Sequence, residues 1–287
     1  MVIILIGIGD NEEDKTYSLC KKVWEIYLST VNTGDVLFFW VSTRINQDED
    51  VILEGNHLFF RDDILQNVSE EELSRPLQKD RFSDWSDLHN LSRKERLKKS
   101  YKWILENYSE NYNFIFNTTA TSIHIISVLR GLCTILPKTG FQGGFPGVLE
   151  NFFHQPRFMF TSGSNTLLSF DLVAKILDED LSIDNLKVPD DVWISMKLIE
   201  IKKILLPRYD IERKVEDIYP DKLDISNEID NAITKGHFHF RVKSEGTREL
   251  TDHILLMEIY KKIHLGAKPS VENFMKLVNN VENFALN

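Results

Sequence analysis

Residues 2–9 read VIILIGIG, and residues 36–41 read VLFFWV. Each is a short, unbroken apolar run, which is typical of a strand buried on both faces. Between the two runs, Leu19, Val23 and Ile26 recur at three- and four-residue spacing, which predicts a helix. A helix between two such strands is a βαβ unit, so we expect a sheet that is at least partly parallel.

The same alternation of strand and helix patterns continues along the chain. Further strands are predicted at residues 57–60, 112–116 and 237–243, with a pair of strands around a glycine turn inside 157–169. Apolar spacing predicts helices within residues 97–108, 126–136, 171–177 and 192–199, and two more helices at the end of the chain, the last after the N-cap candidate Ser270. Residues 140–147, rich in glycine and proline, are expected to form a connector. The pattern favours an α/β domain over residues 1–250 and a helical C-terminal extension over residues 251–287 that packs on it.

The composition limits the class of protein. The 287 residues include 34 Lys plus Arg and 44 Asp plus Glu, a net charge of −10, and 42% are hydrophobic. This composition excludes a disordered or collagen-like chain, and the net charge argues against nucleic acid as a partner. The two cysteines, Cys20 and Cys133, lie in apolar surroundings without metal-ligand spacing, and we expect both to be reduced and buried. Without an apolar run of membrane-spanning length or a basic N-terminal leader, we expect no membrane span and a soluble, cytoplasmic protein, in the host cytosol if the source is viral.

Basic residues concentrate in one segment of this acidic chain. Residues 235–248 contain four Lys or Arg residues and one acid, a local charge of +3. Because strand side chains alternate, one face of the predicted strand carries His237, His239, Arg241 and Lys243. Two interpretations stay open with similar weight, an anion-binding face and an ordinary solvated face. A metal held by the His-x-His pair ranks lower, since no third ligand is visible.

Acidic and hydroxyl residues mark three other candidate sites. Asp190 and Asp191 precede a helical apolar stripe, where they favour a helix cap over a general base with an orienting partner. The segments 119–122 and 162–164 supply hydroxyls, and Gly163 would let a ligand approach the backbone. The sequence lacks a Walker A lysine loop, GxGxxG, GxSxG and HExxH, which argues against the common NTPase, dinucleotide, serine-hydrolase and zinc-protease classes.

In their order along the chain, these segments resemble GT-A fold glycosyltransferases of the β1,3-galactosyltransferase and Fringe type. The resemblance rests on a strand at 112–116 followed by a polar loop, on FTSGSNTLLS at 160–169, and on PDDV at 189–192. It runs from the first strand to about residue 200, and less closely to about 260. It implies a Rossmann-like, mixed and mostly parallel sheet flanked by helices. The segment NTTATS at 117–122 is similar to a version found in divergent, often microbial or viral, members.

One departure from the family concerns the metal site. Where the family has the carboxylates of an acidic DxD motif, this sequence has Thr119 and Thr121, whose neutral hydroxyls bind a divalent cation poorly. We therefore expect no required cofactor and no protein metal site, with Mn²⁺ left as an alternative. The charge of a donor diphosphate would instead be met by Arg241, Lys243 and His239.

The resemblance implies an inverting transferase that moves a sugar from a nucleotide diphosphate donor, with UDP favoured, to a hydroxyl of a glycan acceptor. Asp191 would be the general base and Asp190 its orienting and capping neighbour. The remaining expected site residues are, for the donor, Gly7, Lys99, Thr119, Thr121 and Ser122, and, for the sugar or acceptor, Ser162, Gly163, Ser164 and Trp193 as a stacking platform, with a buried core tryptophan as the alternative. A catalytically silent nucleotide- or glycan-binding protein with the same fold is the other hypothesis.

Overall fold

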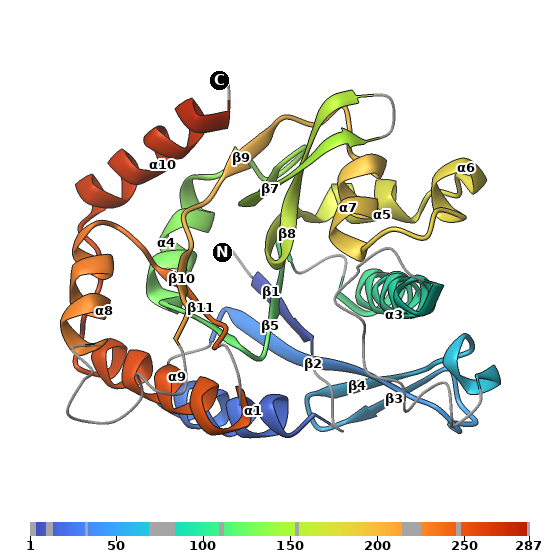
Figure 1. Cartoon of the computed structure of the whole chain (residues 1–287), viewed down its shortest axis with the longest axis horizontal. Helices are drawn as coiled ribbons and strands as arrows, with labels where there is room; N and C mark the ends of the chain where they lie inside the picture. Colours follow the sequence, from blue (N-terminus) through green and yellow to red (C-terminus); the bar gives the residue numbers. More distant parts are fainter. Residues whose placement is uncertain are drawn as a thin grey trace.

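In the computed structural model, a long β-sheet lies in the middle of the molecule (Figure 1). The structure describes residues 4–9, 14–31, 34–68, 84–108, 112–152, 155–213, 225–244 and 248–285. The strands of the long sheet, with those of a smaller sheet, are β1 (Ile4–Gly9), β2 (Val36–Arg44), β3 (Val51–Glu54), β4 (His57–Arg61), β5 (Phe114–Thr119), β6 (Ser122–His124), β7 (Gln142–Phe152), β8 (Gln155–Ser169), β9 (Lys203–Leu205), β10 (Tyr209–Ile211) and β11 (His239–Val242). The helices are α1 (Lys15–Thr30), α3 (Asp84–Tyr108), α4 (Ile126–Ile135), α5 (Phe170–Leu177), α6 (Leu181–Asp184), α7 (Asp190–Lys197), α8 (Ile225–Thr234), α9 (Arg248–His264) and α10 (Val271–Ala285), with a short 3-10 helix at Leu65–Asn67.

The predicted βαβ unit lies at the centre of the large sheet. Strand order is β3-β4-β2-β1-β5-β8-β7-β9, with β1 parallel to both β2 and β5. The pairs β2–β4 and β7–β9 are also parallel, whereas β3–β4, β5–β8 and β7–β8 are antiparallel. The α/β class is therefore confirmed, but the sheet is mixed, and parallel pairs hardly outnumber antiparallel ones.

Two hydrophobic cores cover the two faces of this sheet. Alternate residues of the central strands point to opposite sides, as the neighbours Phe114, Ile115 and Phe116 show. Phe114 and Phe116 pack in the core that includes residues of α1, α4, α8, α9 and α10, and Ile115 packs in the core under α3, α5 and α7. Figure 1 shows these two groups of helices on opposite sides of the sheet. Helices α9 and α10, most of the expected extension, thus share a core with the N-terminal half of the chain.

A second, three-stranded sheet brings together distant parts of the sequence. Its order is β10-β11-β6, with β10 parallel and β6 antiparallel to β11. Phe238, Phe240 and Val242 are fully buried, which confirms the predicted apolar face of the basic strand. The opposite face is not solvated as a whole, since His239 is fully buried too.

The structure corrects two predicted loops. Residues 142–152 form strand β7 instead of a connector, and Pro146, which has no N–H to donate, lies at a register shift in the pairing with β8. Residues 117–119 belong to β5, so the predicted polar loop shrinks to Ala120 and Thr121 before β6 begins.

The predictions for the two cysteines and for Ser270 are confirmed. Both cysteines are buried and free, and the hydroxyl of Ser270 accepts from the backbone N–H of Asn273 at the start of α10. No helix in the described residues has the length and hydropathy that would let it cross a membrane.

Candidate functional site

A bulge in β8 presents the glycine and serines of the predicted site. Thr161 pairs with Pro146 and Thr166 pairs with Gly144, so four residues of β8 face one residue of β7. Residues 162–165, which we call the serine bulge, therefore leave the regular pairing with β7, although Asn165 still pairs with Thr118 of β5. The Thr166 hydroxyl closes the bulge by donating to the Ser162 carbonyl at 2.9 Å. Bulges of this kind redirect side chains and are frequent beside active sites. The predicted pair of strands around a glycine turn is wrong, because β8 runs through Gly163 without reversing direction.

The serine bulge contacts the paired aspartates at the start of α7. The backbone N–H of Gly163 donates to Oδ2 of Asp191 at 3.0 Å, and Oδ1 of Asp191 accepts from the N–H of Val192 at 2.9 Å. Pro189 occupies the N-cap position, so Asp190 is the first residue of the helix and not its N-cap. The prediction that Asp190 caps the helix is therefore wrong. The N-cap is the residue before the first helical residue, and here that residue is Pro189.

The two carboxylates border the same space. A methyl group placed on Gly163 would lie 3.7 Å from Oδ2 of Asp191 and 3.8 Å from Oδ1 of Asp190. Burial, with the neighbouring negative charge of Asp190, raises the pKa of Asp191 to about 6, against the opposing effect of the hydrogen bonds from Gly163 and Val192. A carboxylate with such a pKa is ionised at neutral pH and suited to accept a proton.

Arg208 holds the other side of the serine bulge. Its Nη1 donates to the hydroxyls of Ser162 at 3.0 Å and Ser164 at 2.9 Å, while Nε and Nη2 donate to the two carboxylate oxygens of Asp210 at 2.6 and 2.8 Å. The guanidinium lies 3.9 Å from the centre of the Phe145 ring, and only 6% of the side chain is exposed. Arg208 is not among the residues expected from the sequence, although its two-residue spacing from Asp210 is a signal for such a bidentate pair.

Arg241 and His239 lie on the strand next to this pair. In the register of β10 and β11, Asp210 is opposite Arg241, and on the other side Ser122 is opposite Arg241 and His124 is opposite His239. We call Arg208, Asp210, His239 and Arg241 the arginine cluster. Burial, together with the charge of Arg208, lowers the pKa of Arg241, and burial lowers the pKa of His239 well below its ordinary value.

The histidine of the arginine cluster packs against a second histidine ring. The ring centres of His124 and His239 are 4.2 Å apart, and both residues are fully buried. Thr118 links them to the serine bulge, because its hydroxyl lies 2.7 Å from Nε2 of His124 and donates to the Ser164 carbonyl at 3.1 Å. Burial lowers the pKa of His124 to about 3, so the pair is uncharged at neutral pH.

Three expected donor residues lie together where β5 meets β6, and one of them, Ser122, is opposite Arg241 in the register of β6 and β11. The Thr119 hydroxyl lies 3.3 Å from those of Thr121 and Ser122, but Thr121 and Ser122 are buried and Thr119 alone of these three is partly exposed. Gly7 pairs with Asn117 in the centre of the sheet. Lys243 follows β11 and is exposed.

Two expected residues have contacts other than those expected. Lys99 donates to the Arg61 carbonyl at 2.7 Å and to Asp63 at 2.6 Å, and it lines a polar cavity of about 420 Å³ with Arg96. Trp193 is fully buried and its indole N–H donates to Asp184 at 2.9 Å, so it is the core tryptophan of the alternative and not a stacking platform.

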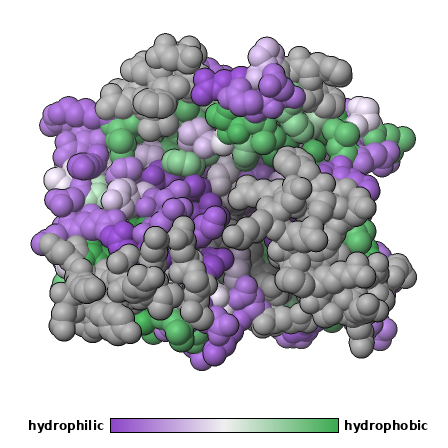
Figure 2. All heavy atoms as spheres, viewed as in Figure 1, coloured by the Kyte–Doolittle hydropathy of each residue, from purple (hydrophilic) through white to green (hydrophobic). Residues whose placement is uncertain are grey.

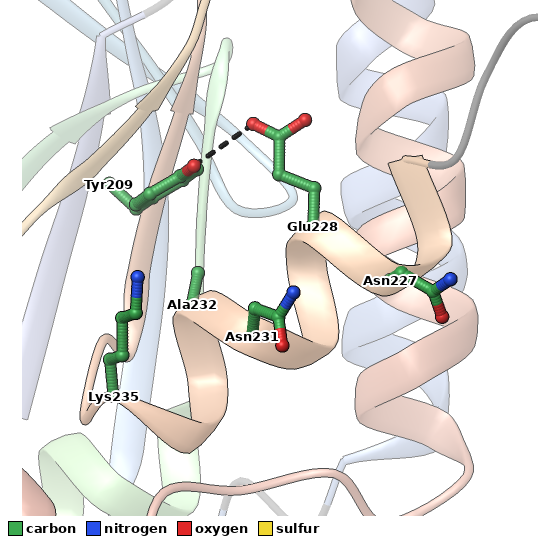
Figure 3. A pocket seen from close by; sticks show the side chains of 6 residues that line it. All are labelled: Tyr209, Asn227, Glu228, Asn231, Ala232 and Lys235. Carbon is green, nitrogen blue, oxygen red and sulfur yellow. Dashed lines mark hydrogen bonds between the residues drawn. The ribbon is translucent and has the colours of Figure 1, made fainter.

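His237 lies outside the arginine cluster. It precedes β11, and its ring packs 5.2 Å from that of Tyr209, which pairs with Phe240 and so lies on the apolar face. On this side, Tyr209 lines a second cavity of about 310 Å³ with residues of α8, and its hydroxyl donates to Glu228 at 3.0 Å (Figure 3). A metal site built on His237 and His239 is not supported by this arrangement.

The donor set around the candidate site does not fit a divalent cation. Hydroxyls occupy the positions of Thr119, Thr121 and Ser122, and Arg241 is opposite Ser122 in the register of β11 and β6. The described part of the chain holds no group of three His, Cys, Asp or Glu residues that could bind a metal. Figure 2 shows hydrophilic residues beside a hollow near the centre of the face it presents.

Comparison with known proteins gives little direct guidance. No protein-family model matches the sequence, and no curated protein matches it. Among solved structures, this chain is similar to a glycosyltransferase involved in the glycosylation of the major capsid of PBCV-1, with 11% sequence identity, coverage of 89% of this chain and 99% of that chain, and a TM-score of 0.41. A likeness this distant identifies neither an activity nor a substrate of this chain.

Proposed function

We propose that this protein is an inverting glycosyltransferase of GT-A type, which moves one sugar from a nucleoside diphosphate sugar to a hydroxyl of a glycan acceptor. The observation that carries the proposal is the position of Asp191. Its carboxylate is oriented by the backbone of Gly163, has a pKa of about 6, and faces the same serine bulge that Arg208 holds from the other side. A base and a cationic group on two sides of one small loop suit a reaction that removes a proton and releases an anion.

In the proposed reaction, Asp191 accepts the proton of the acceptor hydroxyl. The hydroxyl oxygen attacks the anomeric carbon of the donor sugar on the face opposite the diphosphate. The bond between that carbon and the diphosphate oxygen breaks, and its electron pair leaves with the nucleoside diphosphate, so the configuration at the carbon inverts. General-base catalysis of this sort contributes roughly 10²–10⁴-fold to the rate.

The neighbouring residues have supporting roles in this proposal. Asp190 raises the pKa of Asp191 through its charge, which keeps the base near the working pH. Ser162, Gly163 and Ser164 line the transferred sugar, and Thr119 lies toward the donor phosphates. We infer that transfer needs no divalent cation, because hydroxyls replace the carboxylates that would bind one. A UDP-sugar is the favoured donor.

A panel of nucleotide sugars and oligosaccharide acceptors tests the proposal, with product detected by mass spectrometry and the anomeric configuration by NMR. We expect one donor to give an inverted product with the native chain, and at least ~100-fold less with Asp191→Asn. Asp178→Asn, which changes an exposed carboxylate at the end of α5, is the matched control and should keep full activity. Nucleotide binding without turnover across the panel would contradict the proposal and favour the silent binding protein.

A further inference from the structure

Several buried polar groups around the arginine cluster have no hydrogen-bond partner. His239 is fully buried with both ring nitrogens unpartnered, and Asn165 is fully buried with both amide atoms unpartnered. Nε of Arg241 is buried and unpartnered as well. Buried polar atoms are nearly always paired, so such atoms gathered at one place indicate a ligand that supplies the missing partners.

The charges of the cluster indicate the sign of that ligand. Asp210 is already bound by both nitrogens of Arg208, and no ion pair of Arg241 occurs within the residues that the structure describes. Two guanidinium groups therefore share one carboxylate, which leaves one positive charge partly buried. An uncompensated buried charge is costly, and an anion at this position would offset the cost.

The hydroxyls of the serine bulge are oriented to help bind an anion. Because Ser162 and Ser164 both accept from Nη1 of Arg208, their hydroxyl protons point away from the guanidinium. The two oxygens are 3.1 Å apart, so one proton can be donated within the pair and the other remains for a ligand. The arrangement thus presents N–H and O–H donors of different residues to one place.

We propose that Arg208 and Arg241 form a two-arginine clamp for the diphosphate of the donor. One guanidinium lies beside each phosphoryl group and offsets part of its negative charge. The clamp takes over the role that a divalent cation has in metal-dependent enzymes, with His239 and one hydroxyl of the serine bulge as additional partners. Arg241 suits this role because its planar fork can bind phosphate oxygens through two hydrogen bonds at once. Arg208 contributes its charge and the one N–H of Nη2 that remains after its bonds to Asp210, Ser162 and Ser164. The identity of the anion as a donor diphosphate rests on the proposed function.

Calorimetric titration in excess EDTA tests the clamp with inorganic pyrophosphate, UDP and uridine as probes. Arg241→Gln removes one charge without breaking a side-chain hydrogen bond within the described residues, and Arg208→Lys keeps the charge but loses the fork. We expect each variant to weaken binding of pyrophosphate and UDP about tenfold or more, and binding of uridine less than about threefold. Arg157→Gln, which changes an exposed arginine of β8, is the matched control and should bind all probes as the native chain does.

Thermal unfolding without ligand shows whether each variant is folded, and Arg241→Gln remains informative if Arg208→Lys unfolds. Pyrophosphate binding that needs added Mg²⁺ or Mn²⁺, or that both variants retain, would overturn the clamp. If the native chain binds pyrophosphate through both arginines but transfers no sugar, the clamp stands and the proposed function fails. If transfer proceeds and the variants bind UDP normally, the proposed function stands and the clamp fails.

Discussion

The backbone N–H of Gly163 donates to Oδ2 of Asp191 at 3.0 Å. This hydrogen bond joins a bulge of the large sheet to the first turn of α7, two elements whose sequence positions are 28 residues apart. It fixes the orientation of a carboxylate that also accepts the N–H of Val192 from its own helix, at 2.9 Å. The contact is made by the backbone, so it can be kept while the side chain at position 163 is changed.

Gly163→Ala is expected to reduce transfer without unfolding the protein. The added methyl would make ordinary van der Waals contacts, the shortest 3.5 Å to Cβ of Asp191, but it would occupy the space beside both carboxylates. We expect the melting temperature to stay within a few degrees and kcat/KM for the acceptor to fall about tenfold or more, with UDP affinity unchanged. Steady-state kinetics and UDP titration give these values, and full activity in Gly163→Ala would show that no substrate enters this space.

The two aspartates are expected to differ in their effects. Asp191→Asn should lower kcat at least ~100-fold with little change in donor affinity, because it removes the proton acceptor and keeps the shape. Asp190→Asn should lower kcat less, since it acts on the charge of Asp191. If Asp190→Asn has the larger effect, the two roles are reversed.

The pH profile of transfer follows the ionisation of Asp191. With a pKa of about 6, the base is protonated below that pH, so kcat/KM should fall tenfold per pH unit on the acid side. Asp190→Asn removes the neighbouring negative charge, which lowers the pKa of Asp191 and moves the acid limb to lower pH. A limb that stays in place in Asp190→Asn would assign the titration to another group.

His239→Leu is expected to raise stability while it weakens phosphate binding. The native ring is buried with both nitrogens unpartnered, so a leucine of similar size removes a desolvation cost of about 1–3 kcal/mol. The folded-state pKa of His239 lies below its unfolded value of 6.5, so the native chain loses stability as the pH falls below that value. The gain in melting temperature should thus be larger at pH 5 than at pH 8.

Unfolding curves at the two pH values measure this difference, with the exposed His264→Leu as control. An equal or lower melting temperature in His239→Leu would mean that the ring has partners in solution.

Trp193→Phe is expected to affect stability and not sugar binding. The change removes the indole N–H that Asp184 accepts and leaves a gap in the core, which together cost about 1–3 kcal/mol. The melting temperature should fall by several degrees while KM for donor and acceptor stays the same. A raised KM with an unchanged melting temperature would restore the stacking platform.

The parts of the fold that depend on local patterns could be predicted from the sequence. The apolar runs of β1 and β2 and the stripe of α1 follow from periodicity alone. Strand β7 could not be found in this way, since its glycines and Pro146 suit a loop unless pairing with β8 is known. The sequence also could not show that His239 would be buried, because alternation along β11 says nothing about what β6 and β10 place against its polar face.

The candidate site, like the fold, has a part that could be predicted from the sequence and a part that could not. Gly163 and Asp191 could both be expected at the site because a family resemblance related two motifs in order along the chain, although their hydrogen bond could not. Arg208 belongs to neither motif, and its partners Ser162 and Ser164 precede it by 46 and 44 residues. Contacts over such separations arise from tertiary packing, which a single sequence does not record.

The three-stranded sheet also determines when the site can exist during protein synthesis. Strand β6 leaves the ribosome early, whereas β10 and β11 contain residues 209–211 and 239–242 of a 287-residue chain. A nascent chain therefore carries the aspartates of α7 before it carries either arginine of the clamp. A chain that ends before residue 241 retains the strands of the central βαβ unit but lacks Arg241, so the proposed clamp can form only after β11 has been synthesised.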